Sequence, residues 1–549
     1  MPTALLVLFA GLAWPMAGAS EPVLGGAFDE TRFREDIRRL ASDEFEGREP
    51  GSPGEAKTVA YIESGFAAAG LKPVKGNSFR QAVPLVSITA SPDATLAVTG
   101  DDVNLRLAYG SDIVVGTKRV VETVSLEASE MVFAGYGIVA PEFGWNDYAG
   151  LDVRGKTVVV LVNDPGFASG DPKLFRGRTM TYYGRWSYKY EEAARQGAAG
   201  ILIVHETAAA GYAWSVVASS WTGPQLDLDR GHHNAGRAAV QGWLSDAAAK
   251  RVFEAAGQDF DTLSARAAAP GFEPVTLGLD ASLVLTNSIS RLLSSNVIGY
   301  RPGTERPDET IILMAHWDHL GRDETLEGDQ IYNGALDNAT GTAALMELAR
   351  SVASTPLDRS VVFAAVTAEE SGLLGSAYYA EHPLFPLETT VAALNMDGLN
   401  VLGRTRDVVV IGWGQSELED LLRQFAAAQD RVVVPEPFPE KGYFFRSDHF
   451  NLAKKGVPVL YAESGIDDRR RGAEWGRAKS SEYVRNHYHK PSDEYDPGWD
   501  LSGALEDMAL YLRIVRKLAL SREFPEWRAG SEFKPVRDAS AAQRAVPVE

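Results

Sequence analysis

Residues 310–316 read TIILMAH, and this stretch decides the fold because it is one of a series of wholly apolar runs. A run without polar alternation is typical of a strand whose two faces are both buried. Segments with helical periodicity lie between several of these runs, for example GTAALMELARSVAS at 341–354. This alternation predicts an α/β fold with a mostly parallel mixed sheet flanked by helices. The other apolar runs lie within SNVIGYRPG (295–303), SVVFAAVTAEE (360–370), TVAALNMDG (390–398), VVVIGWG (408–414) and VPVLYAESG (457–465).

The sequence changes character on either side of this region. Two amphipathic helices are predicted near the N-terminus, and short alternating runs after Pro84 indicate β-structure. A buried strand at 156–164 and a helix followed by a strand at 188–206 predict a small α/β unit. We therefore expect a discontinuous domain at 24–90 and 286–525. Within it we expect an inserted β-rich α/β domain at 91–285, and after it a flexible tail at 526–549.

Length and composition exclude several classes of protein. At roughly 150 residues per domain, 549 residues predict two to four domains, and 45% hydrophobic residues are typical of a globular protein. The formal net charge of −20 argues against nucleic acid as a partner. Because the chain has no cysteine, disulfides, thiolate metal sites and cysteine nucleophiles are excluded, and any metal site must use His, Asp or Glu.

The N-terminus predicts export. Residues 3–19 read TALLVLFAGLAWPMAGA and end in the small-x-small pattern Ala17-Gly18-Ala19. A membrane anchor is the alternative, but Pro15 and the short apolar length favour a cleaved signal peptide at 1–19. We expect a periplasmic or extracellular protein with no membrane segment after cleavage.

Histidines and carboxylates follow the ends of the predicted parallel strands. His316, Asp318 and His319 follow the first, Glu369 and Glu370 the second, and Asp397 the third, while Asp337 precedes a helix. Ligands of an open parallel sheet bind outside the carboxyl ends of its strands. An Asp before a helix is usually an N-cap, and a pair of glutamates is usually solvated. Carboxylates that converge without a nearby Lys or Arg nevertheless indicate a bound cation, and zinc or another divalent first-row metal fits these oxygen and nitrogen donors.

Six motifs occur in an order that resembles the M28 co-catalytic zinc aminopeptidases. They are AHWDHLG (315–321), NGALDNATG (333–341), TAEESGLLGS (367–376), NMDG (395–398), RSDHF (446–450) and YHKPSD (488–493). The resemblance covers about 290–520 and the N-terminal helices. The stretches GYGIVAPEFGWNDYAGLDVRGKTVVVLVND and AARQGAAGILIVHE resemble the protease-associated (PA) domain that many members carry as an insertion.

The resemblance implies two divalent metal ions, expected to be Zn²⁺. It places one on His316 and Asp397 and the other on Glu370 and His489, with Asp337 as the bridging ligand. This set gives each ion an imidazole, a terminal carboxylate and a shared carboxylate, and leaves a position for a bridging hydroxide.

Three further residues have expected catalytic roles. Glu369 is the expected general base and proton donor, Asp318 the carboxylate that fixes the His316 tautomer, and Tyr488 a donor to the oxyanion. A surface loop is the alternative for Asp318, and packing the alternative for Tyr488. Asp493 either orients His489 or forms a turn.

The remaining motif residues have no single expected role. His319, His449 and His487 are not needed as ligands, and no role follows for Ser447 and Asp448. Residues 443–445 either line an apolar pocket for a substrate side chain or belong to the core. The aromatic stretch 179–190 either covers the cleft as a lid or packs in the core. Arg469 to Arg471 either lie in a solvated loop or attract an acidic substrate.

The expected function is an exported metallo-aminopeptidase that hydrolyses the N-terminal peptide bond of oligopeptides, with a metal-bridged hydroxide and Glu369 as base. One alternative keeps the metal site and acts as a carboxypeptidase or dipeptidase on acidic C-terminal substrates, for which Arg446 and residues 469–471 are the visible basic groups. A catalytically inactive receptor-like protein is the third possibility, but all five ligands and Glu369 are retained.

Overall fold

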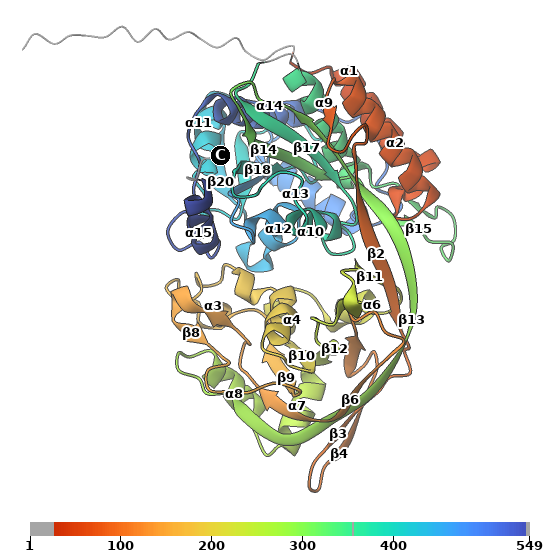
Figure 1. Cartoon of the computed structure of the whole chain (residues 1–549), viewed down its shortest axis with the longest axis vertical. Helices are drawn as coiled ribbons and strands as arrows, with labels where there is room; N and C mark the ends of the chain where they lie inside the picture. Colours follow the sequence, from red (N-terminus) through yellow and green to blue (C-terminus); the bar gives the residue numbers. More distant parts are fainter. Residues whose placement is uncertain (1–26, 354–355, 545–549) are drawn as a thin grey trace, which may run out of the picture.

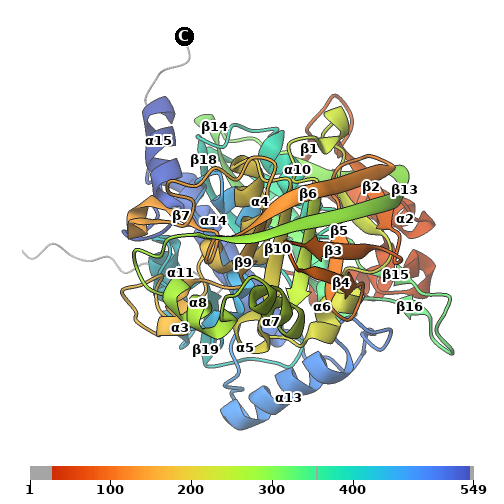
Figure 2. The ribbon, with the colours of Figure 1, turned by 90° about the horizontal axis from the view of Figure 1, so that it is seen from below.

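The computed structural model describes residues 27–353 and 356–544, so the signal peptide expected at 1–19 lies outside the described residues. One long strand, β13 (Val275–Arg301), links the two halves of a continuous sheet (Figures 1 and 2). Its first part pairs with β6 (Thr123–Phe133) and β3 (Thr95–Thr99). Its last part pairs with β2 (Arg80–Ala90) and β17 (Arg359–Val366). The antiparallel pair of β2 and β13, to which β11 (Gln225–Leu228) adds a short third strand, therefore connects the halves.

The upper half in Figure 1 has a parallel centre. Strand β14 (Arg306–His316) lies between β17 and β18 (Thr390–Asn395), and all three are parallel. Strand β21 (Val459–Ser464) continues the sheet in parallel with β18. The next strand, β19 (Asp407–Ile411), is antiparallel to β21 and parallel to the outer strand β20 (Val432–Pro435). The prediction of a mostly parallel mixed sheet flanked by helices is confirmed.

Both faces of this sheet are buried, as the apolar strands predict. Along β14, Ile311 and Leu313 belong to one hydrophobic core, whereas Ile312 and Met314 belong to another. Successive side chains of a strand point to opposite faces, so an unbroken apolar run serves both cores. The first core also contains residues of α1 (Glu30–Leu40), α2 (Pro53–Ala68), α9 (Thr340–Ala353), α11 (Leu418–Ala427) and α14 (Ser502–Leu520). The second contains residues of α10 (Leu374–Glu381) and α12 (His449–Ala453).

The lower half in Figure 1 has hydrophobic cores of its own, formed by residues between 94 and 285. Its centre is parallel, because β10 (Gly200–His205) pairs with β9 (Thr157–Leu161) and β12 (Val240–Ser245) in that direction. The predicted buried strand and the predicted helix-strand unit are thus both present. Further strands of this half include β4 (Asn104–Ala108) and β5 (Ile113–Gly116), and its longer helices are α4 (Trp186–Arg195), α6 (Trp214–Ser220), α7 (Asp246–Ala255) and α8 (Phe260–Ala267).

The segment after residue 526 is not the flexible tail that the sequence suggested, at least as far as Arg544. It forms α15 (Lys534–Arg544) and buries Trp527 and Phe533 in the second core of the upper half. The Trp527 indole donates to the carbonyl of Gly456 over 2.9 Å. The expectation failed because one short helix and a few scattered anchors leave little periodicity in the sequence.

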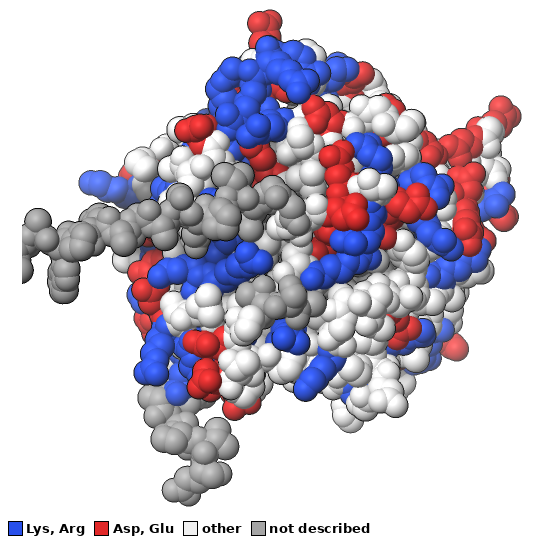
Figure 3. All heavy atoms as spheres, turned by 90° about the horizontal axis from the view of Figure 1, so that it is seen from above, with Lys and Arg blue, Asp and Glu red and all other residues white. Residues whose placement is uncertain are grey.

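One helix and the distribution of charge distinguish the surface of the molecule. Helix α13 (Gly472–Asn486) lies at the margin of the molecule and has only Gly476 buried among its residues (Figure 2). Acidic and basic side chains both occur across the face shown in Figure 3. In the two described ranges, no helix combines the length and the apolar character needed to cross a bilayer.

Candidate metal centre

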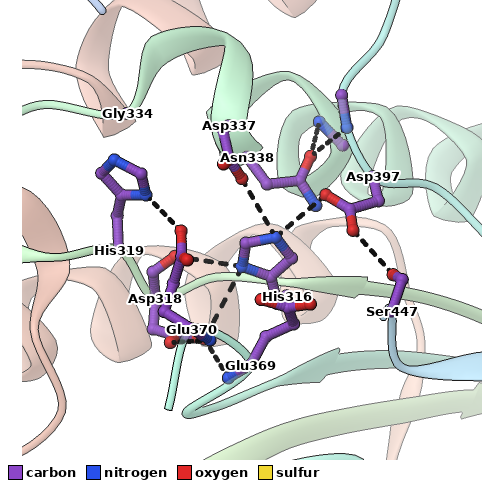
Figure 4. A network of polar contacts seen from close by, with 12 residues as sticks. His316, Asp318, His319, Gly334, Asp337, Asn338, Glu369, Glu370, Asp397 and Ser447 are labelled. Carbon is purple, nitrogen blue, oxygen red and sulfur yellow. Dashed lines mark hydrogen bonds and ion pairs between the residues drawn. The ribbon is translucent and has the colours of Figure 1, made fainter. Parts of the chain in front are cut away.

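Three parallel strands bring the predicted residues to one edge of the sheet (Figure 4). His316 ends β14 and pairs in register with Val366, the last residue of β17, while Met314 pairs with Asn395 at the end of β18. The residues that follow β17 and β18, Glu369 with Glu370 and Asp397, therefore lie beside His316. Parallel pairing is what converts these separate strand ends into one site.

Asp337 reaches the site from the loop before α9. Its backbone amide donates to Asp493 Oδ2 over 3.1 Å, and the amide of Leu336 donates to the same carboxylate. Asn338 Oδ1 accepts the amide of Gly398, next to Asp397, over 3.0 Å. Two side chains thus fix the loop against the neighbouring strand end and against the segment that carries His489.

Asp337 faces one histidine with each carboxylate oxygen. Its Oδ1 lies 3.3 Å from His316 Nε2, and its Oδ2 lies 3.2 Å from His489 Nε2. His316 Nε2 is also 3.1 Å from Asp397 Oδ1, and His489 Nε2 is 3.1 Å from Glu370 Oε2. The structure therefore brings together all five predicted ligands, in two groups that share Asp337.

This donor set fits divalent metal ions. One ligand atom from each of His316, Asp337 and Glu370 lies within 4.8 Å of the others, and the same holds for His316, Glu369 and Asp397. Although burial opposes it, the carboxylates of Asp397 and Glu369 raise the pKa of His316 well above its ordinary value. Such buried negative charge is compensated by a cation, and imidazole with carboxylate is a donor set that zinc accepts.

Glu369 has the environment of a general base. Burial raises the pKa of its carboxyl well above the ordinary value, and the nearby carboxylates of Asp397 and Glu370 raise it further. Its side chain meets no hydrogen-bond donor among the described residues. A carboxylate with a raised pKa can take a proton and later give it up near neutral pH.

Asp318 is buried at the centre of the site, and its contacts differ in part from the expectation. Its carboxylate accepts the backbone amides of Glu369 over 3.1 Å and Glu370 over 3.4 Å. His316 Nδ1 lies 3.1 Å from the carbonyl oxygen of Asp318 but 3.7 Å from its carboxylate. The carbonyl is thus the closer partner of the imidazole, and the carboxylate mainly orients the segment with the two glutamates.

The contacts of three residues, Ser447, His319 and Asp493, could not be inferred from the sequence. Ser447 donates to Asp397 Oδ2 over 2.6 Å and accepts from the side-chain amide of Asn395 over 2.7 Å. His319 Nδ1 lies 2.6 Å from Glu370 Oε1. Asp493 binds the loop of Asp337 rather than His489. The motifs RSDHF and YHKPSD contain these residues, but only the folded chain shows which ligand each one contacts.

Tyr488 stacks on the ligand candidate beside it. The rings of Tyr488 and His489 lie 3.9 Å apart at an interplanar angle of 24°, and Tyr488 is 39% exposed. Its hydroxyl has no hydrogen-bond partner among the described residues. The structure therefore places it at the site and leaves its hydroxyl available.

The site opens into a cleft of about 2100 Å³ between the two halves. Trp186 and Trp221 line it from the lower half, opposite Glu369, Asp397 and Tyr488. The aromatic stretch 179–190 was expected to be either a lid over the cleft or part of the core, and it contributes to both places. Trp186 lines the cleft, whereas Tyr183 and Tyr188 lie in the core.

The two other segments with open roles are also divided. Phe444 and Phe445 belong to the core, but Tyr443 is 37% exposed and lines the cleft. Arg469 donates to the backbone carbonyls of Thr405 and Gln429, and Arg471 pairs with Asp468. Arg469 and Arg471 thus hold the connection before α13 in place, and Arg470 lines the cleft.

The family model and two curated relatives that match this chain are all of peptidases. Residues 296–513 match the model of peptidase family M28. Aminopeptidase YwaD of Bacillus subtilis (strain 168) is 28% identical over 229 residues, which are 41% of this chain and 44% of that protein. Aminopeptidase NAALADL1 of Mus musculus is 36% identical over 139 residues, which are 23% of this chain and 17% of that protein. The chain thus matches less than half the length of these relatives.

Among solved structures, an aminopeptidase from Aneurinibacillus sp. strain AM-1 aligns over 91% of this chain and 96% of its own, with 20% sequence identity and a TM-score of 0.47. A zinc aminopeptidase from Bacillus subtilis aligns over 92% of this chain and 99% of its own, with 17% identity and a TM-score of 0.42.

Proposed function

We propose, from the premise that residues 296–513 place this chain in peptidase family M28, that the protein is an exported metallo-aminopeptidase. It would hydrolyse the N-terminal peptide bond of oligopeptides. The main support is that the two carboxylate oxygens of Asp337 face different histidines. Oδ1 lies 3.3 Å from His316 Nε2, and Oδ2 lies 3.2 Å from His489 Nε2. A carboxylate with each oxygen directed to a separate imidazole is the arrangement that a bridging ligand of two metal ions needs.

The proposed ligands form two sets. His316 and Asp397 would hold one zinc ion, Glu370 and His489 the other, and Asp337 both. When bound, such ions supply Lewis acidity and lower the pKa of water. The second oxygens of Asp397 and Glu370 are engaged by Ser447 and His319, which limits rotation of both carboxylates.

The chain's own residues would move the proton. Glu369 would take it from the attacking water and deliver it to the amine that leaves, because its raised pKa suits both transfers. Asp318 holds the Glu369 amide, so the base keeps its position relative to the ligands. Tyr488, which lines the cleft and whose hydroxyl has no hydrogen-bond partner among the described residues, would donate to the developing oxyanion.

The inserted segment and the N-terminus complete the proposal. Residues 91–285 would form a PA-like domain inserted into a peptidase domain of 24–90 and 286–525, in agreement with the separate cores of residues 94–285. Residues 1–19 would act as a secretory signal peptide.

A specific observation favours a second candidate, a carboxypeptidase or dipeptidase. Arg446 and Arg185 line the cleft from opposite halves, and neither forms an ion pair with a described residue. Arginines without an acidic partner suit the recognition of a carboxylate. An inactive receptor is the least favoured alternative, since the five ligand candidates and Glu369 are all present.

One screen tests the proposal. Purified protein is supplied with zinc and offered aminoacyl p-nitroanilides, N-acetylated peptides, and peptides with an acidic C-terminal residue. Release of nitroaniline from free aminoacyl substrates, with no cleavage of N-blocked peptides, is the expected result. Cleavage of N-blocked peptides from their C-terminus would instead establish the second candidate.

A further inference from the structure

Beside Asp397, the cleft is lined by two apolar residues and one acidic residue of neighbouring strands. The apolar residues are Val409 and Ile411, here called the floor, and the acidic residue is Glu463. In the antiparallel pair of β19 and β21, Val409 lies directly opposite Glu463 and Ile411 directly opposite Tyr461. Directly opposed residues project to the same face of a sheet. All four residues line the cleft, so the carboxylate of Glu463 lies beside the apolar side chains of Val409 and Ile411.

Glu463 is joined to the proposed metal centre through one hydroxyl group. Tyr461 Oη lies 2.5 Å from Glu463 Oε1 and 3.2 Å from the backbone carbonyl oxygen of Asp397. A residue that occupies this pocket would therefore lie next to the reacting peptide bond.

A second acidic residue, Glu436, lies at the same wall. It accepts the amide of Gly412 with Oε1 over 2.8 Å, but its Oε2 is buried and has no hydrogen-bond partner among the described residues. Glu436 is 7% exposed and acts electrostatically on Glu463. One carboxylate oxygen next to the pocket thus lacks the donor that a buried oxygen normally has.

Among the described residues, cations compensate these two carboxylates only weakly: Arg176 acts electrostatically on Glu436 but forms no ion pair with it. Neither Glu436 nor Glu463 forms an ion pair within 4.0 Å in the described residues. Arg176 is near Glu436 but donates to the carbonyl of Trp413, and Lys441 stacks on Phe438 at 4.6 Å. Burial raises the pKa of Glu463 to about 7, with the carboxylates of Asp397 and Glu436 adding to the rise. A cation from outside the chain would relieve this repulsion.

We infer that Val409, Ile411 and Glu463 form a pocket for the side chain of an N-terminal lysine or arginine, an inference that rests on the proposed aminopeptidase function. Lysine and arginine combine an aliphatic stem with a charged head, as the apolar floor and the terminal carboxylate require. The substrate's α-ammonium group has the same charge but no stem, so it makes no use of the floor.

The first experiment measures kcat/KM for the p-nitroanilides of lysine, arginine, leucine and norleucine. The wild type should prefer lysine and arginine. Glu463→Gln should lower kcat/KM for these two by about tenfold or more relative to leucine, as expected for the loss of a charge-assisted contact. Glu482→Gln is the matched control, because Glu482 also lines the cleft but is paired with Lys479 at 2.7 Å.

The outcomes separate the pocket from the proposed function. An equal loss for all four substrates would assign Glu463 to the α-ammonium group, and an unchanged ratio would remove it from recognition; either result overturns the inference. Hydrolysis of leucine anilide in those cases would leave the aminopeptidase function intact. Failure to hydrolyse any anilide would instead reject the proposed function.

A second experiment uses only the wild type and does not depend on how a variant folds. Lysinamide and norleucinamide both carry an α-ammonium group and have similar aliphatic stems, but only lysinamide has an ammonium group at the end of its side chain. Lysinamide should inhibit hydrolysis of leucine anilide with an inhibition constant about tenfold lower than that of norleucinamide. Equal inhibition would contradict the inferred pocket.

Discussion

The hydroxyl of Ser447 donates to Asp397 Oδ2 over 2.6 Å, which leaves Oδ1 of the same carboxylate directed at His316. Ser447 is itself oriented by the side-chain amide of Asn395, two residues before Asp397. A carboxylate with one oxygen fixed in this way loses less rotational freedom when it binds a metal ion. The contact joins the RSDHF and NMDG motifs into one unit.

Ser447→Ala should therefore weaken metal binding without removing a ligand. Loss of a group that orients a ligand typically costs about 10- to 100-fold in metal affinity. Competition with a fluorescent zinc chelator measures the affinity. Ser351→Ala, which alters a serine on α9 that donates to backbone carbonyls, is the control, and equal zinc affinities in all three proteins would contradict the role of Ser447.

Glu369→Gln should abolish turnover while metal remains bound, because the amide cannot accept the proton from water. General-base catalysis contributes roughly 10²- to 10⁴-fold, so kcat should fall by about that factor. Steady-state kinetics and elemental analysis of the same preparation give both quantities. If this variant hydrolyses substrate at the wild-type rate, Glu369 is not the base.

Variants of His489 and Asp337 should differ in the number of zinc ions that they bind. His489 faces Asp337 and Glu370, so His489→Ala should reduce the bound zinc from two ions toward one. Asp337 faces both histidines, so Asp337→Ala should weaken both positions. Zinc is counted after dialysis against a weak chelator. A His489→Ala protein that retains two ions would exclude this residue as a ligand.

Removal of the metal should inactivate the enzyme reversibly. The buried carboxylates of the site require a cation, and the proposed chemistry needs Lewis acidity. Treatment with a strong chelator should abolish anilide hydrolysis, and added zinc or cobalt should restore it. Full activity after exhaustive metal removal, confirmed by elemental analysis, would be incompatible with the proposed mechanism.

Acid should destabilise the fold partly through His449. This side chain is buried against Phe444 and Tyr461, and neither ring nitrogen has a partner among the described residues. Burial lowers the pKa of His449 from 6.5 to about 3. Between these values the unfolded chain binds a proton that the folded chain does not, so stability falls as the pH drops from about 6.5 toward 3.

His449→Leu should remove this contribution. The slope of the unfolding free energy against pH, measured by urea denaturation between about pH 4 and 6, should decrease by about one proton equivalent, or 1.4 kcal/mol per pH unit. His232→Leu changes an exposed histidine and serves as the control. An unchanged slope in His449→Leu would mean that this histidine is protonated in the folded state.

The sequence predicted more of the upper half's centre than of the molecule's periphery. Strands such as 310–316 are apolar on both faces, and that pattern depends only on local composition, so it is readable without the fold. The segment around Trp527 and α15 was missed because its anchors are too few to form a period. Strand β13 extends from 275 to 301 and passes through the expected boundary at 285 without a break, since a strand shared by two sheet halves has no compositional change to mark it.

The sequence by itself determined which donor atoms are available and near which strand ends they lie. Without cysteine, a metal site had to consist of histidine and carboxylate, and parallel strands had to bring their carboxyl ends to one edge. Only the tertiary structure decided which oxygen faces which partner. Asp397 and Ser447 are 50 residues apart, and Asp337 and Asp493 are 156 apart. Hydrogen bonds over such separations depend on how loops pack, and packing is a property of the whole folded chain rather than of any one motif.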